Sequence, residues 1–339
     1  MHVLLRCAMW SASPVLFVPL AASRTMAQSR ARTALTCREL PGWPRLAAGD
    51  TLGMVSGVAV DPAGHVVAFR RAGRRWDSET FDMTPIAPPT VLVFRAGSGT
   101  VVRAWGAGRF VMPHGLTVDR AGNVWLTDVA LHQVYKFSPT GQPLLTLGER
   151  GVPGRDATHF NMPSGVAVAA DGSFYVSDGY GNTRVLHYAA DGRLLRQWGD
   201  SGAGPGRFDL VHGVTLGRGG RVYVADRENQ RVQIFDTTGR FLGQWRSDAL
   251  GKPFALAGGP VGTRWAGTWL VADGGRAGYA DDANAPSGVA VVGPDGAVRA
   301  RFAEPGRDAL APLRPHALAV GADGAVYVAG LRLAKFTCR

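Results

Sequence analysis

The sequence predicts an all-β fold, a six-bladed β-propeller of four-stranded repeats. Three observations support this prediction: a phrase that recurs six times, hairpin turns within each copy, and a composition rich in glycine. The chain has 339 residues, of which 46 are Gly and 46% are hydrophobic. That apolar content is sufficient for a packed core, and frequent glycines suit tight turns between short strands.

The recurring phrase joins a Gly-Val-Ala-Val type of run to a turn and a second apolar run. Copies begin at residues 54, 112, 162, 210 and 314, and a degenerate copy begins at 252. Turns such as Asp171-Gly172 lie between the two runs, and Asp-Gly is a strong hairpin signal because glycine accepts a positive φ. One repeat cannot bury its apolar face alone, so six copies predict a closed ring of blades.

Each repeat also contains a third and a fourth strand, for example 184–188 and 196–198 in the third copy. The last repeat ends soon after Phe336, short of a full blade. We therefore expect a strand from about 40–53 to complete this blade and close the ring. Several tryptophans are expected to pack between blades, namely Trp76, Trp105, Trp125, Trp198 and Trp245.

The first residues have the pattern of a secretory signal, with Arg6 followed by an apolar stretch over 7–22 and small residues near Ala27. This pattern predicts a signal peptide over 1–27, a single propeller domain over 28–339, and a secreted or periplasmic location. No later stretch is long and apolar enough to predict a membrane span. In an oxidising compartment Cys37 and Cys338 either pair or stay free, and the sequence leaves both open.

The net charge is +11, from 37 Lys and Arg against 26 Asp and Glu. No run of five basic residues occurs, so we expect a solvated surface and no nucleic-acid partner.

One position of the repeat, here called the axial slot, lies just before the small residue that opens the first strand. The six copies hold there Ser56, His114, Ser164, His212, Phe254 and His316. First strands line the channel of a propeller, and alternate blades of six are about 120° apart, so the three imidazoles point at one spot on the axis. Three nitrogen ligands with an open fourth position are typical of catalytic zinc. The alternative is three core histidines bonded to the backbone.

Three segments carry a resemblance to a known family: Met112 to Phe137, VSDGYGNTR at 176–184, and VADRENQRVQIF at 224–235. They resemble the peptidyl-α-hydroxyglycine α-amidating lyases, which are six-bladed β-propellers of NHL-type four-stranded repeats. The resemblance covers residues 54 to about 330. It implies a carbon–nitrogen lyase that converts a peptidyl-α-hydroxyglycine or similar carbinolamide into an amide and glyoxylate, in peptide amidation.

The resemblance also implies the roles of individual residues. It implies zinc on His114, His212 and His316, with Tyr180 as the catalytic base and Arg71 as a catalytic and substrate-binding residue. Zinc would act as Lewis acid, and Tyr180 would serve as phenolate if zinc or Arg71 lowers its pKa.

Further implied roles concern the substrate and a second metal. Arg227 matches a second arginine near the site, and Arg314, which stands where the family usually has Met, adds a third cation for the substrate carboxylate. The family's calcium would be held partly by backbone carbonyls of Val58 and Leu116, but Ala317 replaces its carboxylate ligand.

Two other functions compete with the lyase. One is a non-enzymatic NHL-repeat propeller that binds a protein, carbohydrate or nucleic acid. The other is a calcium-dependent hydrolase or lactonase on a six-bladed propeller. A recurring aspartate after the second strand, at Asp128, Asp178 and Asp226, is expected to anchor loops rather than to catalyse. The sequence does not specify the natural substrate, a partner oxygenase or the oligomeric state.

Overall fold

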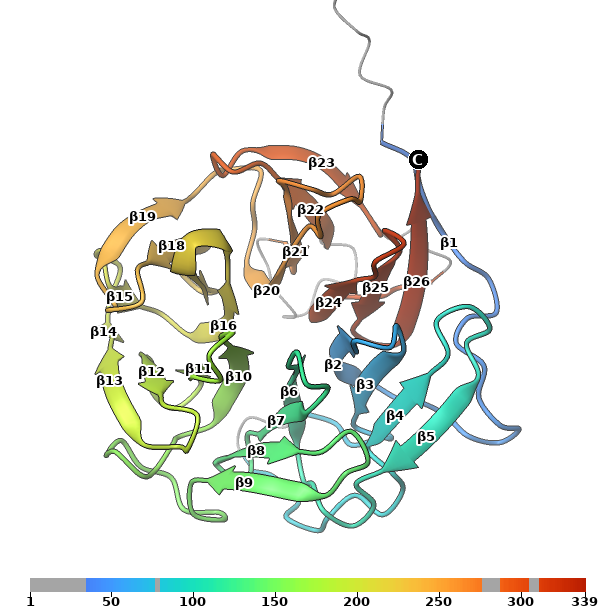
Figure 1. Ribbon diagram of the computed structural model, residues 1–339, viewed down its shortest axis with the longest axis horizontal. Helices are drawn as coiled ribbons and strands as arrows, with labels where there is room; N and C mark the ends of the chain where they lie inside the picture. Colours follow the sequence, from blue (N-terminus) through green and yellow to red (C-terminus); the bar gives the residue numbers. More distant parts are fainter. Residues whose placement is uncertain (1–34, 77–79, 276–286, 305–310) are drawn as a thin grey trace, which may run out of the picture. The chain divides into compact units, whose positions relative to one another are not determined.

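Six antiparallel four-stranded sheets follow one another around a central axis in the computed structural model of the protein (Figure 1). The structure describes residues 35–76, 80–275, 287–304 and 311–339, and residues 35–339 form one unit. The predicted six-bladed β-propeller is confirmed. The predicted signal peptide over 1–27 lies outside the described residues. Within the described residues, no helix has the length and apolarity needed to traverse a bilayer.

The first three blades are built from consecutive strands. Blade 1 contains β2 (Val55–Val60), β3 (Val66–Arg70), β4 (Val91–Phe94) and β5 (Val101–Trp105). Blade 2 contains β6 (Pro113–Val118), β7 (Val124–Asp128), β8 (Gln133–Phe137) and β9 (Pro143–Leu147). Blade 3 contains β10 (Pro163–Val168), β11 (Phe174–Asp178), β12 (Arg184–Tyr188) and β13 (Leu194–Trp198).

The next two blades repeat this plan. A short parallel pair, β14 (Asp200–Ser201) and β15 (Arg207–Phe208), precedes blade 4. Blade 4 contains β16 (Val211–Leu216), β17 (Val222–Asp226), β18 (Arg231–Phe235) and β19 (Phe241–Trp245), with the 3₁₀ turn η1 (Arg218–Gly220) between its first two strands. Blade 5 contains β20 (Pro253–Gly258), β21 (Trp269–Asp273), β22 (Gly288–Val292) and β23 (Val298–Phe302).

Blade 6 joins the two ends of the described chain. It contains β24 (Ala317–Val320), β25 (Val326–Ala329) and β26 (Leu333–Cys338), and its outer strand is β1 (Cys37–Glu39). Cys37 lies opposite Cys338 in this antiparallel pair, and the two form a disulfide 301 residues apart in sequence. A cross-link of this span restricts the unfolded chain strongly and stabilises the closed ring.

The predicted position of the closing strand, about 40–53, was wrong. The strand is β1 and ends at Glu39. Pro41 and Pro44 lack the N–H groups that a strand uses, and Gly42 between them has a φ of 70°; these residues turn the chain away from the sheet. The turned segment places Trp43 in the core between blades 6 and 1.

Each interface between neighbouring blades contains its own apolar cluster. Four of the five predicted inter-blade tryptophans are confirmed, since each packs on an aromatic ring of the next blade. The pairs are Trp105–Phe137, Trp125–Phe174, Trp198–Phe235 and Trp245–Trp269. These clusters fix the positions of neighbouring blades around the axis, because closely packed side chains leave the blades no room to shift against one another.

The recurring aspartate anchors the segment that leads into each first strand, as predicted. Asp128 accepts hydrogen bonds from the amides of Val111 and Met112, at 2.7 and 3.0 Å. Asp178 accepts from the amide of Asn161 and pairs with Arg184, and Asp226 accepts from Asp209 and pairs with Arg231. These carboxylates are fully buried, and their bonds position the axial slot that follows.

Candidate metal centre

The axial slots of blades 2, 4 and 6 bring three histidines together. His114 and His212 are the second residues of β6 and β16, and His316 directly precedes β24. Their candidate ligand atoms all lie within 4.8 Å of one another. Ring centroids are 4.9, 4.7 and 4.8 Å apart, so the imidazoles form a nearly equilateral triangle. All three side chains are buried, and the cluster could hold a metal ion.

The slots of the other three blades orient these imidazoles. Nδ1 of His114 lies 2.7 Å from the carbonyl oxygen of Ser164, Nδ1 of His212 lies 2.8 Å from that of Phe254, and Nδ1 of His316 lies 2.7 Å from that of Ser56. A carbonyl only accepts hydrogen bonds, so each Nδ1 carries the proton and each Nε2 keeps its lone pair. Around the axis, ligands and orienting carbonyls therefore alternate from blade to blade.

A glycine after the slot makes this close approach possible. A Cβ at Gly115 would lie 2.6 Å from the carbonyl oxygen of Ser164, and one at Gly213 would lie 2.8 Å from that of Phe254. These are the carbonyls that accept from His114 and His212. The His-Gly pair in the repeat thus has a physical basis, because a side chain after the ligand would push away its orienting partner.

Burial keeps the imidazoles neutral. It lowers the pKa of His316 to about 3, with Arg71 adding to the effect. It also holds the pKa values of His114 and His212 well below the ordinary value, assisted by the neighbouring His316. Nε2 of His212 is buried and has no hydrogen-bond partner. Neutral imidazoles are what a metal requires, and a metal would satisfy the orphaned Nε2 of His212.

Tyr180 lies against this cluster, as the resemblance implies. Its hydroxyl oxygen is 3.0 Å from Nε2 of His114 and 3.4 Å from Nη1 of Arg227. Burial raises the pKa of Tyr180, although the charges of Arg227 and Arg71 oppose the rise. Arg71 acts in the direction that the resemblance implies, but desolvation outweighs the two arginine charges at Tyr180.

Arg71 lies beside the cluster, and its charge acts on His114, His316 and Tyr180. The side chain is buried, and its Nε donates a 3.0 Å hydrogen bond to the carbonyl of Pro113 in blade 2. Its guanidinium lies 5.2 Å from the ring centre of Trp76.

Trp76 is a site residue that we expected between blades, and that expectation was wrong. Its ring lies 4.9 Å from that of Tyr180 and 6.2 Å from that of His114. Trp76 lies on the connection between β3 and β4, outside any strand. The segment around it, FRRAGRRWDSETF, lacks the alternation of apolar and polar residues that a strand has. This missing alternation is the sequence signal that places Trp76 on a loop.

Arg227 completes the polar side of the centre and has partners that sequence reasoning missed. Its guanidinium lies 4.9 Å from the ring centre of Phe254 and 5.5 Å from that of Tyr180. Nε of Arg227 donates a 2.8 Å hydrogen bond to Glu228, whose other carboxylate oxygen pairs with Lys252. Glu228 thus holds Arg227 in place, and only its position next to Arg227 in sequence hinted at this.

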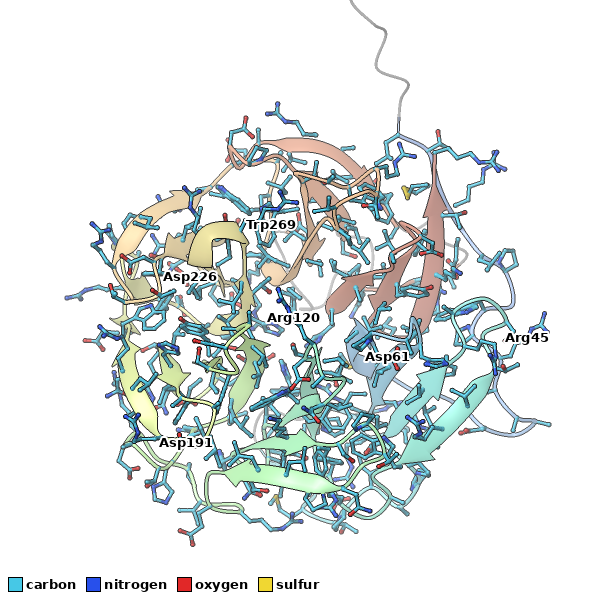
Figure 2. All side chains as sticks on the ribbon, in the orientation of Figure 1. Arg45, Asp61, Arg120, Asp191, Asp226 and Trp269 are labelled. Carbon is cyan, nitrogen blue, oxygen red and sulfur yellow. A yellow bond between two sulfur atoms is a disulfide. The ribbon has the colours of Figure 1, made fainter. Side chains whose placement is uncertain are left out.

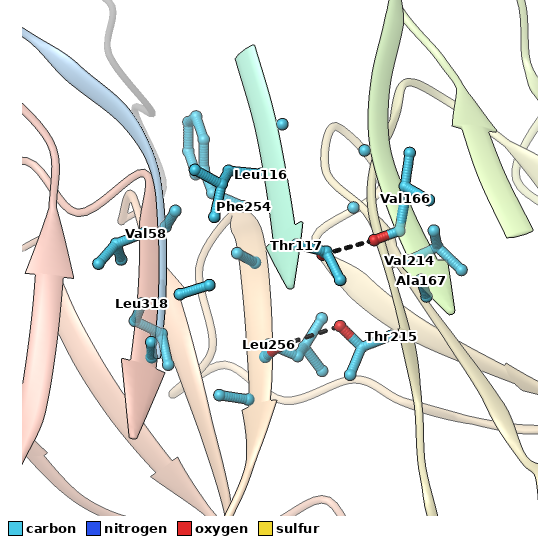
Figure 3. A pocket seen from close by; sticks show the side chains of 18 of the residues that line it. Val58, Leu116, Thr117, Val166, Ala167, Val214, Thr215, Phe254, Leu256 and Leu318 are labelled. Carbon is cyan, nitrogen blue, oxygen red and sulfur yellow. Dashed lines mark hydrogen bonds between the residues drawn. The ribbon is translucent and has the colours of Figure 1, made fainter. Parts of the chain in front are cut away.

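The remaining predicted residues lie near the axis or the cluster. Arg314 is half-buried on the segment leading to His316, with a φ of 44°, and its contact with substrate stays a prediction. Val58, Leu116 and Ala317 line an axial cavity of about 370 Å³, and the three histidines line it as well. Figure 3 shows its apolar wall. None of the described residues lining it is acidic, so calcium finds no carboxylate ligand there.

Comparison with known proteins relates this chain to a repeat family and to named relatives. The NHL repeat family model matches residues 160–188 and 208–235. The chain is 38% identical over 327 residues to peptidyl-alpha-hydroxyglycine alpha-amidating lyase 1 of Drosophila melanogaster, covering 88% of this chain and 59% of that protein. It is 37% identical over 300 residues to peptidyl-glycine alpha-amidating monooxygenase B of Xenopus laevis, covering 82% of this chain and 33% of that protein.

The chain is homologous to the peptidyl-α-hydroxyglycine α-amidating lyases. The resemblance found in the sequence is thereby confirmed. The chain spans about three fifths of the Drosophila lyase and one third of the Xenopus protein. A solved streptogramin B lyase structure shares the fold, with a TM-score of 0.53, 14% identity and coverage of 90% of this chain and 98% of that one.

The lowered pKa of His316 predicts acid destabilisation of the metal-free protein. Between about pH 3 and the ordinary value of 6.5, the folded state binds fewer protons at His316 than the unfolded chain does. Stability from this group is therefore complete above pH 6.5 and is lost as the pH falls. We expect the free energy of unfolding, from urea denaturation, to fall about 1.4 kcal/mol more per pH unit below pH 6 in wild type than in His316→Gln. If the free energy of unfolding fell equally with pH in wild type and in His316→Gln, His316 would not be neutral in the folded state.

Proposed function

We propose that the protein is a zinc-dependent lyase that cleaves the carbon–nitrogen bond of a peptidyl-α-hydroxyglycine or similar carbinolamide, releasing an amide and glyoxylate. The observation that carries the proposal is the triangle of neutral, buried imidazoles beside Tyr180, Arg71 and Arg227. The similarity to peptidyl-alpha-hydroxyglycine alpha-amidating lyases supports the same reaction.

Zinc is the metal that this donor set favours. His114, His212 and His316 would hold it through Nε2, since each Nδ1 is engaged by a carbonyl. Three imidazoles without a carboxylate or thiolate suit Zn²⁺ with an open fourth position. When bound, zinc would supply Lewis acidity that lowers the pKa of the substrate hydroxyl.

The arginines account for the substrate carboxylate. Arg71 and Arg227 approach the centre from blades 1 and 4, and both charges act on Tyr180, His114 and His316. A guanidinium binds a carboxylate through two parallel hydrogen bonds, which also orients it. Arg71 is our first choice for this contact, with Arg227 and Arg314 assisting. Trp76 and Phe254, on which these guanidinium groups stack, give the site apolar walls.

Tyr180 is the group that we assign to proton transfer. As the phenolate, its oxygen takes the proton of the substrate hydroxyl while a C=O bond forms at that carbon. The carbon–nitrogen bond breaks, its electron pair leaves with the amide nitrogen, and that nitrogen receives the proton. The products are R-CO-NH₂ and glyoxylate, with no oxidant or water consumed. Because burial raises the pKa of Tyr180 despite two arginines, the base needs a further positive charge nearby.

We also propose that the protein acts outside the cytoplasm, in a secreted or periplasmic location. The Cys37–Cys338 disulfide supports this, because such bonds form and persist in oxidising compartments. The signal-like pattern over 1–27 points the same way.

The direct test is glyoxylate release from α-hydroxyhippurate by the zinc-loaded protein. We expect one glyoxylate per substrate cleaved, and a kcat lowered about 10²- to 10⁴-fold in Tyr180→Phe because the base is lost. Tyr223→Phe is the matched control, since Tyr223 packs between Trp245 and Trp269 away from the cluster. Absence of glyoxylate from zinc-loaded wild type would overturn the proposal, and an unchanged kcat in Tyr180→Phe would remove its role.

Glu228 is predicted to be a positioning residue for Arg227. Glu228→Ala removes the acceptor of the Arg227 Nε hydrogen bond, so we expect KM for α-hydroxyhippurate to rise about tenfold with a smaller change in kcat. Glu228→Gln keeps an oxygen acceptor and should recover most of the affinity. Equal KM values for Glu228→Ala and wild type, or a Gln variant as poor as the Ala variant, would refute this role.

A further inference from the structure

A second cavity opens on the face of the propeller opposite the histidines. The first strands run from the axial slots to turns at this face, where Arg120 lies between β6 and β7 and Arg218 and Arg221 lie between β16 and β17. These three arginines line one cavity of about 840 Å³, here called the far-mouth cavity. Figure 2 shows Arg120 beside the central axis and Trp269 farther out on blade 5, and both residues line the cavity.

The far-mouth cavity adjoins the axial cavity. Val168, Leu216 and Gly258 line both the far-mouth cavity and the axial cavity. The two cavities therefore meet at the ends of β10, β16 and β20. The length of these strands separates the arginines from the imidazoles, so the far-mouth cavity is not part of the metal centre.

The three arginines form no ion pair with any carboxylate among the described residues. None of the described residues lining the far-mouth cavity is acidic, and no described side-chain hydrogen bond or ion pair involves Arg120, Arg218 or Arg221. The buried arginines of the blades differ, because Arg184 and Arg231 each pair with an aspartate. Like charges grouped without counter-charges attract anions.

Nearby turn carboxylates are engaged within their own turns. Asp119, next to Arg120, accepts hydrogen bonds from Asn123 and from the indole of Trp125. Asp236, near the β16–β17 turn, accepts from Thr238 and pairs with Arg240. These contacts hold both carboxylates in their own turns, and neither carboxylate pairs with an arginine of the far-mouth cavity.

The shape of the cavity suits a small molecule rather than a flat surface contact. Its wall contains Tyr223 and Trp269, whose rings are 4.2 Å apart. Its rim contains Gly219 and Gly220, with φ values of 68° and 71°. A Cβ at Gly217 would lie 2.5 Å from the Tyr223 ring, so the chain passes close to this aromatic wall. A guanidinium binds oxyanions through a planar pair of donors.

We propose that the far-mouth cavity binds a small polyanion with at least two oxyanion groups. Two groups are required because Arg120 comes from blade 2 whereas Arg218 and Arg221 come from blade 4, on the other side of blade 3. The groups are phosphates or carboxylates, which share the same guanidinium chemistry. This site goes beyond the proposed lyase function and needs neither the metal nor the carbinolamide.

Titration calorimetry of the full-length protein tests this site, with inorganic pyrophosphate and tricarballylate as probes and acetate as the single-carboxylate control. The same titrations on His212→Ala exclude binding at the metal centre. We expect a 1:1 complex with at least one polyanion in both proteins, and the tighter probe identifies the phosphate or carboxylate class. Acetate should bind at least about tenfold more weakly, since it engages only one side of the cavity.

A charge-matched pair of triple variants locates the site. Arg120→Gln/Arg218→Gln/Arg221→Gln should weaken polyanion binding at least about tenfold. Arg95→Gln/Arg193→Gln/Arg246→Gln removes the same charge from exposed arginines elsewhere and should change it less than about twofold. If the first triple variant does not fold, Arg120→Gln replaces it, with threefold weaker binding expected. Absence of 1:1 binding, equal weakening in both triple variants, or equally tight acetate binding would overturn the proposal, whatever the outcome of the glyoxylate assay.

Discussion

The contact on which the centre depends is the hydrogen bond between each ligand imidazole and the slot carbonyl of the next blade. It occurs three times, at 2.7 to 2.8 Å, and each instance crosses an interface between blades. One contact therefore fixes the tautomer of a ligand and ties two blades at the axis. The glycines after His114 and His212 allow the carbonyl of the next blade to come this close, since a Cβ there would displace it. Orientation by such outer partners is general for metal-binding histidines.

Burial acts on the centre in two opposite ways. It keeps the three imidazoles neutral, which prepares them as ligands, and it raises the pKa of Tyr180, which opposes the role of base that we propose for this residue. The charge of Arg227 reinforces the first effect, and the charges of Arg71 and Arg227 oppose the second without overcoming it. A cation at the imidazole triangle would lower the pKa of Tyr180 further.

Sequence reasoning reached the features that repeat. The six copies of the repeat predicted six blades. Equivalent positions in the first strands of a closed ring face the same axis, so the alignment of the copies predicted that His114, His212 and His316 meet there. It missed the features that occur once. The closing strand depends on where Pro41 and Pro44 interrupt pairing, Trp76 lies on a connection with no period, and Glu228 matters only through Arg227. The arginines of the far-mouth cavity come from turns of different blades, and only the fold brings them together.

The central claim is that the three slot imidazoles hold one metal ion, and X-ray absorption at the zinc edge tests it most directly. Full-length protein loaded with zinc and freed of loosely bound metal is the sample, with His212→Ala as comparison. The account predicts one zinc per chain with three imidazole nitrogens at about 2.0–2.1 Å, and loss of that shell in the variant. A zinc shell without three imidazoles, or one unchanged in His212→Ala, would contradict it.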